Sequence, residues 1–386
     1  MKRNIISLIL LTPIVIIITI SYASKVKRDM PSGKYKLVCI DSILLDYPKS
    51  YLVQGVSASH LTAIRNGYIW KDAGVGSFHQ FDLKGRLLHS YQGQYKLCPD
   101  EHQKSCKKIP LRAGSVVIGN KYVYIYDDLT QYWFLYDMQG NFVNRFKRMQ
   151  QYKHSAILGS SYILGTNDSI VFIPLTQFDT LKRYTEPIVY MVDLHTGKTL
   201  KKFLEPDSML LKYKNRVQIY PSTSVTVEID YKKKELYTAH SHDYHIYKYN
   251  YATGEKIMVF GEAPPNYHAH IPMPAMKYRP ITLVVRDTIN AYSRKNWRYS
   301  PVLCYNDKHK IIARTVYAPP KPNRQVDSYL QVYRSTTGEL ITQIKLPENY
   351  FNLCYITDDL EFWIEHKKYT KDDPYIIYKT KLVPEP

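Results

Sequence analysis

The chain has 386 residues, enough for one large all-β domain or for two or three smaller domains. Its 37 Tyr, with many Val, Ile, Phe and Thr, favour strands, whereas the Ala and Leu runs that form helices are scarce. The formal net charge of +19, from 53 Lys and Arg against 34 Asp and Glu, attracts anionic surfaces. The basic residues are scattered, however, and no nucleic-acid module is recognisable, so we expect no nucleic-acid partner.

Residues 1–23 have the pattern of an export signal. Two basic residues precede an apolar run from Ile5 to Ile20, and small residues stand three and one before a cleavage point after Ala23. An uncleaved membrane anchor is the alternative, because basic residues also follow at 25–28. No Cys follows the run directly, so lipid attachment is not expected there. We therefore expect a periplasmic or cell-envelope protein, either released or anchored in the inner membrane.

The most informative pattern is a hairpin that recurs five times. In each copy an aromatic or Val strand residue leads through a polar turn to a Gly, and an aromatic residue or Ile stands six positions later. Gly supplies the positive φ that ends a tight hairpin, and an Asp or Asn in the turn bonds to its backbone. The glycines, spaced by 55, 57, 57 and 84 residues, are Gly85, Gly140, Gly197, Gly254 and Gly338.

A second series of six polar turns, each between two expected strands, supports a count of six units. These turns are at 66–67, 120–121, 167–168, 230–231, 306–307 and 358–359. Repeats of this size are typical of four-stranded propeller blades. We expect the blades at 51–91, 112–146, 154–203, 222–260, 299–346 and 350–383.

The sixth expected blade lacks a final strand of its own. Residues 34–45 form an apolar strand candidate ahead of the first blade. Pairing this strand beside residues 375–378 would close the ring and remove the open sheet edges. The sequence therefore predicts an all-β fold, a six-bladed β-propeller over residues 34–383 with four-stranded antiparallel blades and a ring closed by the N-terminal strand.

An export leader followed by blades that end in Tyr-Asp-x-x-Gly or Asp-x-x-x-Gly resembles the six-bladed TolB-like or NHL-like propellers of Bacteroidetes. The resemblance covers nearly the whole mature chain, and the five glycines match its blade turns only. The resemblance implies a fold but does not indicate one function, since propellers of this kind bind proteins, bind glycans or hydrolyse small molecules. The chain departs from many of these relatives because it lacks a lipobox Cys.

Five cysteines, Cys39, Cys98, Cys106, Cys304 and Cys354, would allow two disulfides in an oxidising compartment. We expect Cys98 and Cys106 to pair, because they bracket a polar loop that has little apolar material to order itself. Their spacing does not fit a zinc site or haem attachment.

Hydrolysis is the main alternative to a binding role. A lactonase-like propeller needs acidic and amide side chains from several innermost strands around a metal in the central channel. The expected innermost strands offer only Glu228, His60 and Asn352. The sequence also has no Gly-x-Ser-x-Gly elbow and no Gly-rich phosphate loop. We therefore assign no catalytic residue and no cofactor, with a divalent metal as the open alternative.

The densest cluster of titratable residues is at 240–245. Strand alternation places His240 and His242 on one face, where two imidazoles are able to ligate zinc. One strand supplies an incomplete site, and His268 and His270 are the candidates to complete it.

The long insertion after the fourth expected blade, residues 261–280, is the best candidate for partner binding. Its five prolines restrict the chain before a partner arrives. It also offers stacking and hydrogen-bonding groups on Tyr267, His268, His270, Tyr278 and Arg279. The alternative is a Pro-rich loop that only covers the propeller, and residues 92–111 are a second candidate.

Together these patterns favour an exported, non-catalytic propeller that binds or scaffolds an envelope protein or a glycan. Most of the Tyr residues recur at strand positions and are expected to pack between blades, so glycan stacking is one option among several. The alternative function is a metal-dependent small-molecule hydrolase with its site in the central channel.

Overall fold

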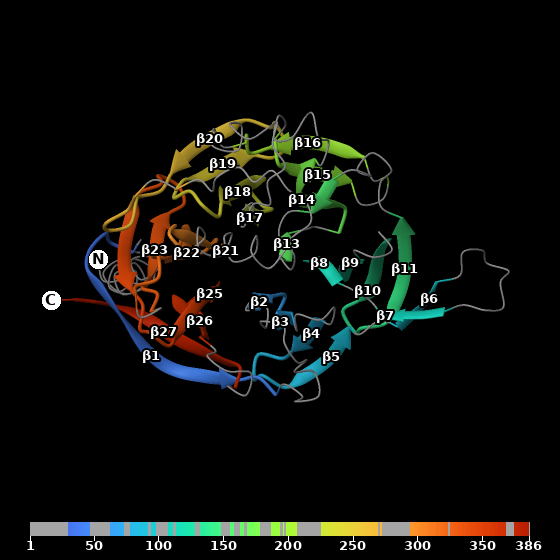
Figure 1. Cartoon of the computed structure of the whole chain (residues 1–386), viewed down its shortest axis with the longest axis horizontal. Coiled ribbons are helices and arrows are strands. Elements are labelled where there is room, and N and C mark those ends of the chain that lie inside the picture. Colours follow the sequence, from blue (N-terminus) through green and yellow to red (C-terminus); the bar gives the residue numbers. More distant parts are fainter. Residues whose placement is uncertain are drawn as a thin grey trace, which may run out of the picture.

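The computed structural model is a ring of six antiparallel sheets around a central axis (Figure 1). The structure describes residues 30–46, 62–72, 78–91, 94–97, 107–110, 113–127, 132–147, 155–157, 163–165, 168–177, 187–193, 196, 198–206, 225–268, 271, 294–322, 325–367 and 374–385. Over these ranges every regular element is a strand, and no helix is long and apolar enough to cross a membrane. The predicted six-bladed β-propeller is confirmed.

The strands of each blade are named here from the innermost to the outermost. Blade 1 contains β2 (Thr62–Arg65), β3 (Tyr68–Asp72), β4 (Phe78–Phe81) and β5 (Leu87–Tyr91). Blade 2 contains β8 (Ala113–Ile118), β9 (Tyr122–Asp127), β10 (Tyr132–Asp137) and β11 (Phe142–Lys147). Blade 3 contains β12 (Ser155–Ile157), β14 (Ile170–Gln177), β15 (Val189–Asp193) and β16 (Thr199–Phe203).

The second half of the ring follows the same plan. Blade 4 contains β17 (Val225–Asp230), β18 (Glu235–His240), β19 (Ile246–Asn250) and β20 (Lys256–Phe260). Blade 5 contains β21 (Arg298–Asn306), β22 (Ile311–Tyr317), β23 (Ser328–Arg334) and β24 (Leu340–Lys345). Blade 6 contains β25 (Tyr350–Ile356), β26 (Glu361–His366), β27 (Ile376–Pro384) and, on the outside, β1 (Tyr35–Leu44).

Two short segments depart from this plan. β13 (Ile163–Gly165), from the chain between β12 and β14 of blade 3, pairs in parallel with β8, the innermost strand of blade 2. β6 (Gln94–Leu97) and β7 (Lys107–Pro110) form a separate two-stranded sheet outside the blades. This small sheet lies in the 92–111 segment that the sequence gives as the second binding candidate.

The N-terminal strand closes the ring as predicted. β1 pairs antiparallel with β27 from Tyr35 opposite Pro384 to Leu44 opposite Ile376, with a bulge between Cys39 and Asp41. Ile43 lies in the core formed by blades 6 and 1 and is 4% exposed. Figure 1 shows β1 along the outside of blade 6.

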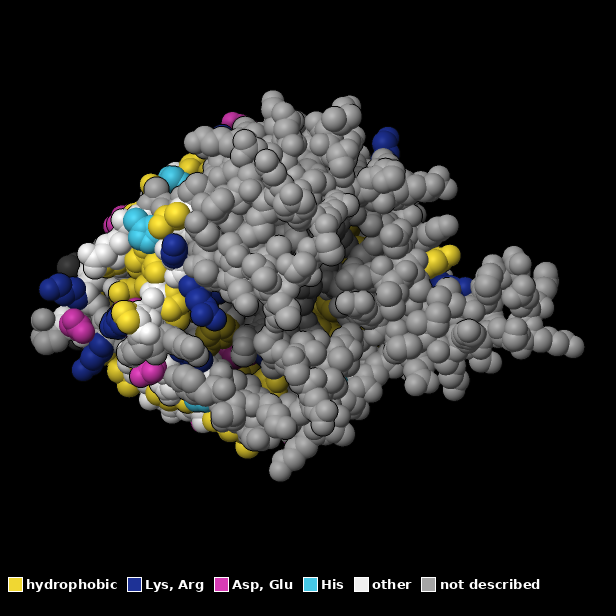
Figure 2. Space-filling model, viewed as in Figure 1, with side chains coloured by type: hydrophobic (Ala, Val, Ile, Leu, Met, Phe, Trp, Pro, Cys, Tyr) yellow, Lys and Arg dark blue, Asp and Glu magenta, His cyan; other side chains and the backbone are white. Residues whose placement is uncertain are grey.

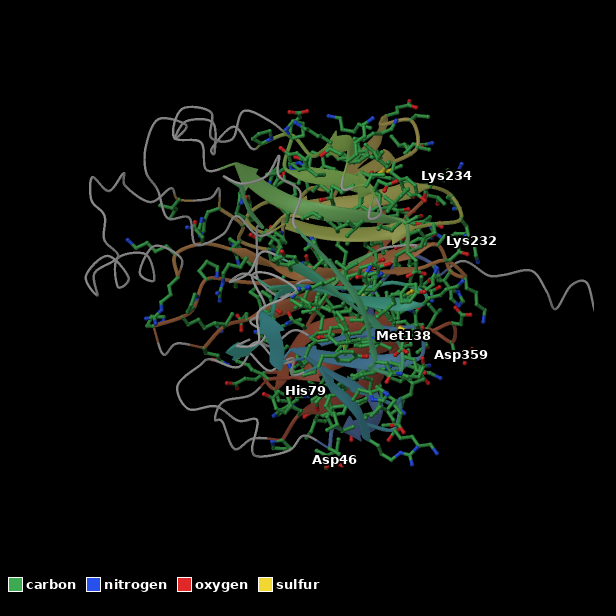
Figure 3. All side chains as sticks on the ribbon, turned by 90° about the vertical axis from the view of Figure 1, so that its right-hand side faces the viewer. Asp46, His79, Met138, Lys232, Lys234 and Asp359 are labelled. Carbon is green, nitrogen blue, oxygen red and sulfur yellow. The ribbon has the colours of Figure 1, made fainter. Side chains whose placement is uncertain are left out.

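The connections divide between two faces of the ring. Because the strands of a blade are antiparallel, the turns between its first and second strands and between its third and fourth strands lie on one side. We call this side the turn face. Figure 3 shows Lys232, Lys234, Met138 and Asp359, all in such turns, on one side of the ring. The opposite side, which we call the loop face, carries the connections between blades.

The repeated glycines are required for two reasons. Gly85, Gly140, Gly254 and Gly338 have φ between 76° and 90°, which confirms the left-handed conformation expected of them. A Cβ at Gly85 would also lie 2.1 Å from the backbone oxygen of Leu44, in the outermost strand of the preceding blade. Turn glycines therefore also allow close approach between blades. Gly197 lies outside the described residues.

The second series of turns joins neighbouring blades by hydrogen bonds. The Asp168 carboxylate of blade 3 accepts hydrogen bonds from the backbone of 120–121 in blade 2, at 3.1 and 3.0 Å. The Asn306 amide of blade 5 donates to the backbone oxygen of Thr357 in blade 6, at 3.0 Å. Polar turn residues thus satisfy each other across the blades and hold the turn face together.

A buried ion pair also joins blade 1 to blade 6. The Lys71 ammonium of β3 lies 2.5 Å from the Glu365 carboxylate of β26, and the side chains are 0% and 4% exposed. Removing one partner of such a pair leaves a buried charge, which costs more than the intact pair contributes. The Lys71–Glu365 pair therefore favours the observed packing of blade 1 against blade 6, the blade that contains the closing strand.

We predict that Ile43→Ala lowers the free energy of unfolding by about 2–4 kcal/mol, because it leaves a cavity in the core of the closing strand. Ile40→Ala is the matched control in the same strand. Its side chain is 47% exposed, so we expect a loss below about 1 kcal/mol. Urea unfolding of both variants measures the difference, and equal losses would contradict closure through β1.

Candidate functional site

The histidine pair of the metal prediction lies on the loop face, where β18 turns toward β19. The His240 and His242 rings are 5.1 Å apart between centroids, and both side chains are buried. His240 Nε2 lies 3.2 Å from the backbone oxygen of Glu205 in blade 3. No group of three His, Cys, Asp or Glu side chains suited to a metal occurs among the residues that the structure describes. Zinc binding by this pair stays a prediction.

The innermost strands use their predicted hydrolase residues for internal contacts. Glu228 of β17 forms an ion pair with Arg65 of β2 at 3.0 Å, from the opposite side of the ring, and so spans the channel. The Asn352 amide oxygen accepts a hydrogen bond from the Tyr317 hydroxyl. His60 lies outside the described residues. Both described candidates are therefore engaged with protein groups.

The start of the long insertion meets two other segments on the loop face. Tyr267 packs edge-on against Tyr244, in the turn between β18 and β19, with ring centroids 5.2 Å apart. Its ring is 6.4 Å from that of Trp297, which precedes β21, and Trp297 lies 6.2 Å from Tyr329 of β23. We call Tyr244, Tyr267, Trp297 and Tyr329 the aromatic cluster. It lies between blades 4 and 5.

Blade 5 holds the start of the insertion through its backbone. The Gln331 amide donates to the backbone oxygen of Glu262 at 3.0 Å, and the Glu262 N–H donates to the Tyr333 hydroxyl at 3.1 Å. Gly261 has φ of 130°, and a Cβ there would lie 2.2 Å from the backbone oxygen of Tyr244. The chain therefore leaves β20 pressed against the neighbouring turn, which brings Tyr267 to the cluster.

Of the residues predicted to bind a partner, some lie in or beside the aromatic cluster and the others lie outside the residues that the structure describes. Tyr267 is half-buried in the cluster, and His268 beside it is exposed. His270, Tyr278 and Arg279 lie outside the described residues. Figure 2 shows histidine, hydrophobic and basic side chains together on the left of the loop face, over blades 4 and 5. Arg294 and Lys295, which stand just before Trp297 in the chain, are exposed.

The sequence analysis missed a buried arginine beneath the cluster. Arg314 of β22 is 1% exposed, and its guanidinium lies over the Tyr299 ring, 4.4 Å from the centroid. Its Nε donates to Gln331 at 3.2 Å, and its Nη2 donates to the backbone oxygen of Tyr244. Among the described residues it forms no ion pair with a carboxylate. The sequence signal that could have indicated this buried arginine was a charged residue inside the mostly apolar run 311–317.

Three cysteines are free thiols. Cys39 is exposed on β1, whereas Cys304 of β21 and Cys354 of β25 are buried. Burial raises the pKa of the Cys304 and Cys354 thiols well above the ordinary value. These three cysteines do not form the second disulfide that five cysteines would allow. Cys98 and Cys106 lie outside the described residues, so their disulfide stays a prediction.

We predict that native protein is alkylated at Cys39, while Cys304 and Cys354 react about 100-fold more slowly, because they are buried and protonated. Cys98 and Cys106 should react only after reduction. Peptide mass spectrometry after iodoacetamide treatment, with and without urea and reductant, separates these classes. Labelling of Cys304 at the rate of Cys39 in the native protein would contradict the structure.

The chain matches no protein-family model and no curated protein. It is similar to the crystal structure of a DUF4221-family member from Bacteroides vulgatus, with a TM-score of 0.61 and 13% identity over 92% of this chain and 100% of that one. It is also similar to a candidate exported protein from Bacteroides fragilis, with a TM-score of 0.51 and 11% identity over 90% and 95% of the two chains. At these identities the similarity concerns the fold alone, and it places the chain among β-propellers with Bacteroides neighbours.

Proposed function

We propose that this protein is an exported, non-catalytic β-propeller that binds an envelope protein or glycan through its loop face. The observation that carries the proposal is the aromatic cluster between blades 4 and 5. Tyr267 is half-buried there and His268 is exposed, so the cluster offers ring surface to a partner. Aromatic residues in such partly exposed clusters are typical of binding surfaces.

The contrast between the two faces supports this choice. Turn-face residues such as Asp168 and Asn306 use their polar atoms to join the blades. The cluster on the loop face is instead built from the β18–β19 turn, the β20–β21 connection and Tyr329 of β23, which take no part in closing the ring. A rigid scaffold that carries variable connections on one side is a common arrangement in binding proteins.

Export is proposed from the N-terminal pattern of residues 1–23, which lies outside the described residues. The candidate exported status of the similar Bacteroides fragilis protein supports it. In the cell envelope the net charge of +19 would favour an anionic partner. The exposed Arg294 and Lys295 bring part of that charge next to the cluster.

Site-specific photocrosslinking in living cells tests the proposal. We predict that a benzophenone amino acid at His268, which is exposed beside the cluster, forms a higher-mass adduct. The same amino acid at Lys233, exposed in a turn-face turn, is the matched control and should form none. Adducts at Lys233 alone, or at neither position, would rule out the loop face of blades 4 and 5 as the binding surface.

A further inference from the structure

We propose that the interface between blades 4 and 5 recognises the carboxylate of an acidic saccharide, through unpaired donors on Arg314, Trp297 and Tyr299. This inference rests on the proposed binding function and names its ligand class. All three side chains belong to blade 5 or to the residue that leads into it. They are 1%, 5% and 3% exposed, so each polar atom is shielded from water.

Each of these residues carries a buried donor that the protein leaves unused. Arg314 Nη1, Trp297 Nε1 and the Tyr299 hydroxyl have no hydrogen-bond partner. Buried polar atoms are almost always satisfied in folded proteins, because leaving one unpaired costs stability. Unpaired buried atoms also occur elsewhere in the described residues, as at Gln80 Nε2 and the Tyr231 hydroxyl, but between blades 4 and 5 three donors share one interface.

The three donors lie on one face of blade 5. Tyr299 pairs with Val316 of β22, and Arg314 is two residues from Val316, so both side chains point to the same side of the sheet. The guanidinium lies over the Tyr299 ring, 4.4 Å from its centroid. Trp297 and Tyr299 belong to one apolar cluster, which Tyr244 and Tyr267 of the loop face also contact. The donors therefore share the packed interface beneath the aromatic cluster.

The chemistry of the donors selects an anion. A guanidinium is a planar donor that fits a carboxylate, and hydrogen bonds to an ionised acceptor are the stronger kind. Burial raises the pKa of Tyr299 well above its ordinary value, so its hydroxyl keeps its proton and donates. Asp243, whose charge acts on Tyr299, has its carboxylate 2.9 Å from His245 Nδ1. Because Arg314 forms no ion pair among the described residues, its charge is available to an anionic ligand.

The surroundings favour a sugar as the carrier of the carboxylate. The Tyr267 and Trp297 rings lie 6.4 Å apart between centroids, and an aromatic face of this kind stacks on the C–H face of a sugar ring. Because the donors are buried, a ligand reaches them only when the half-buried Tyr267 side chain turns outward. Arg294 and Lys295, which stand just before Trp297 in the chain, are exposed and add positive charge that favours an acidic polymer.

Isothermal titration of the purified full chain tests this assignment. The probes are tetragalacturonate, tetramannuronate and, as the neutral control of equal length, cellotetraose. We expect at least one uronate to bind at least about tenfold more tightly than cellotetraose, because only the uronates supply a charged acceptor. Equal binding of acidic and neutral probes, or binding of none, would overturn the assignment.

Two conservative variants separate recognition from folding. Tyr299→Phe removes one unused donor and keeps the ring, so uronate affinity should fall about tenfold while the melting temperature without ligand stays equal or rises. Tyr231→Phe is the matched control, because it also removes a buried hydroxyl without a partner but lies in the β17–β18 turn on the turn face, and it should keep affinity within about twofold. A lower melting temperature with unchanged affinity in Tyr299→Phe would show a structural hydroxyl and refute the site. Crosslinking at His268 without uronate binding would refute only the ligand class, not the binding function.

Discussion

The antiparallel pairing of β1 with β27 is the constraint on which the remaining structure depends. It joins the first described strand to the last, and the Glu385 N–H also donates to the backbone oxygen of Lys34 at 3.0 Å. Without β1, the outer edge of blade 6 would be open and the ring would lack its link between the chain ends. Closure also brings Leu44 against Gly85, so the β4–β5 hairpin of blade 1 is positioned by the closing strand.

Given a closed ring, the two faces have different physical roles. The turn face is built from short hairpins whose polar residues bond across blade boundaries, and these bonds leave little for a ligand to use. The loop face carries the connections, and between blades 4 and 5 it brings Tyr244, Tyr267 and Trp297 together over a buried arginine. Hydrogen bonds between blades thus occur on both faces, and the groups of the proposed binding surface lie on the loop face.

Most of the fold could be predicted from the sequence because its repeat has local physical causes. A Gly with positive φ and an Asp or Asn in the turn can be recognised from the order of residues alone, as at Gly85 and Gly140. The contact of Gly85 with Leu44 could not, because the contacting atom belongs to the preceding blade. The parallel pairing of β13 with β8 likewise depends on how two blades meet.

The candidate site was only partly predictable, for the same reason. Tyr267 and His268 stand in a segment whose composition indicates binding, and His240 and His242 lie side by side as their spacing suggested. The other members of the aromatic cluster come from distant segments, and no local pattern connects Trp297 to Tyr244. The unused donors of Arg314 and Tyr299 appear only when blades 4 and 5 are packed together.

The most direct test of this account is hydrogen–deuterium exchange of the protein in isolated cell envelopes compared with the purified protein. If the loop face between blades 4 and 5 binds the partner, exchange should slow in peptides covering 241–247 and 261–268. Peptides covering the turns at 230–235 and 306–311 should exchange at the same rate in both samples. Slowing at those turns, with none at 241–247 and 261–268, would contradict the assignment of the binding face.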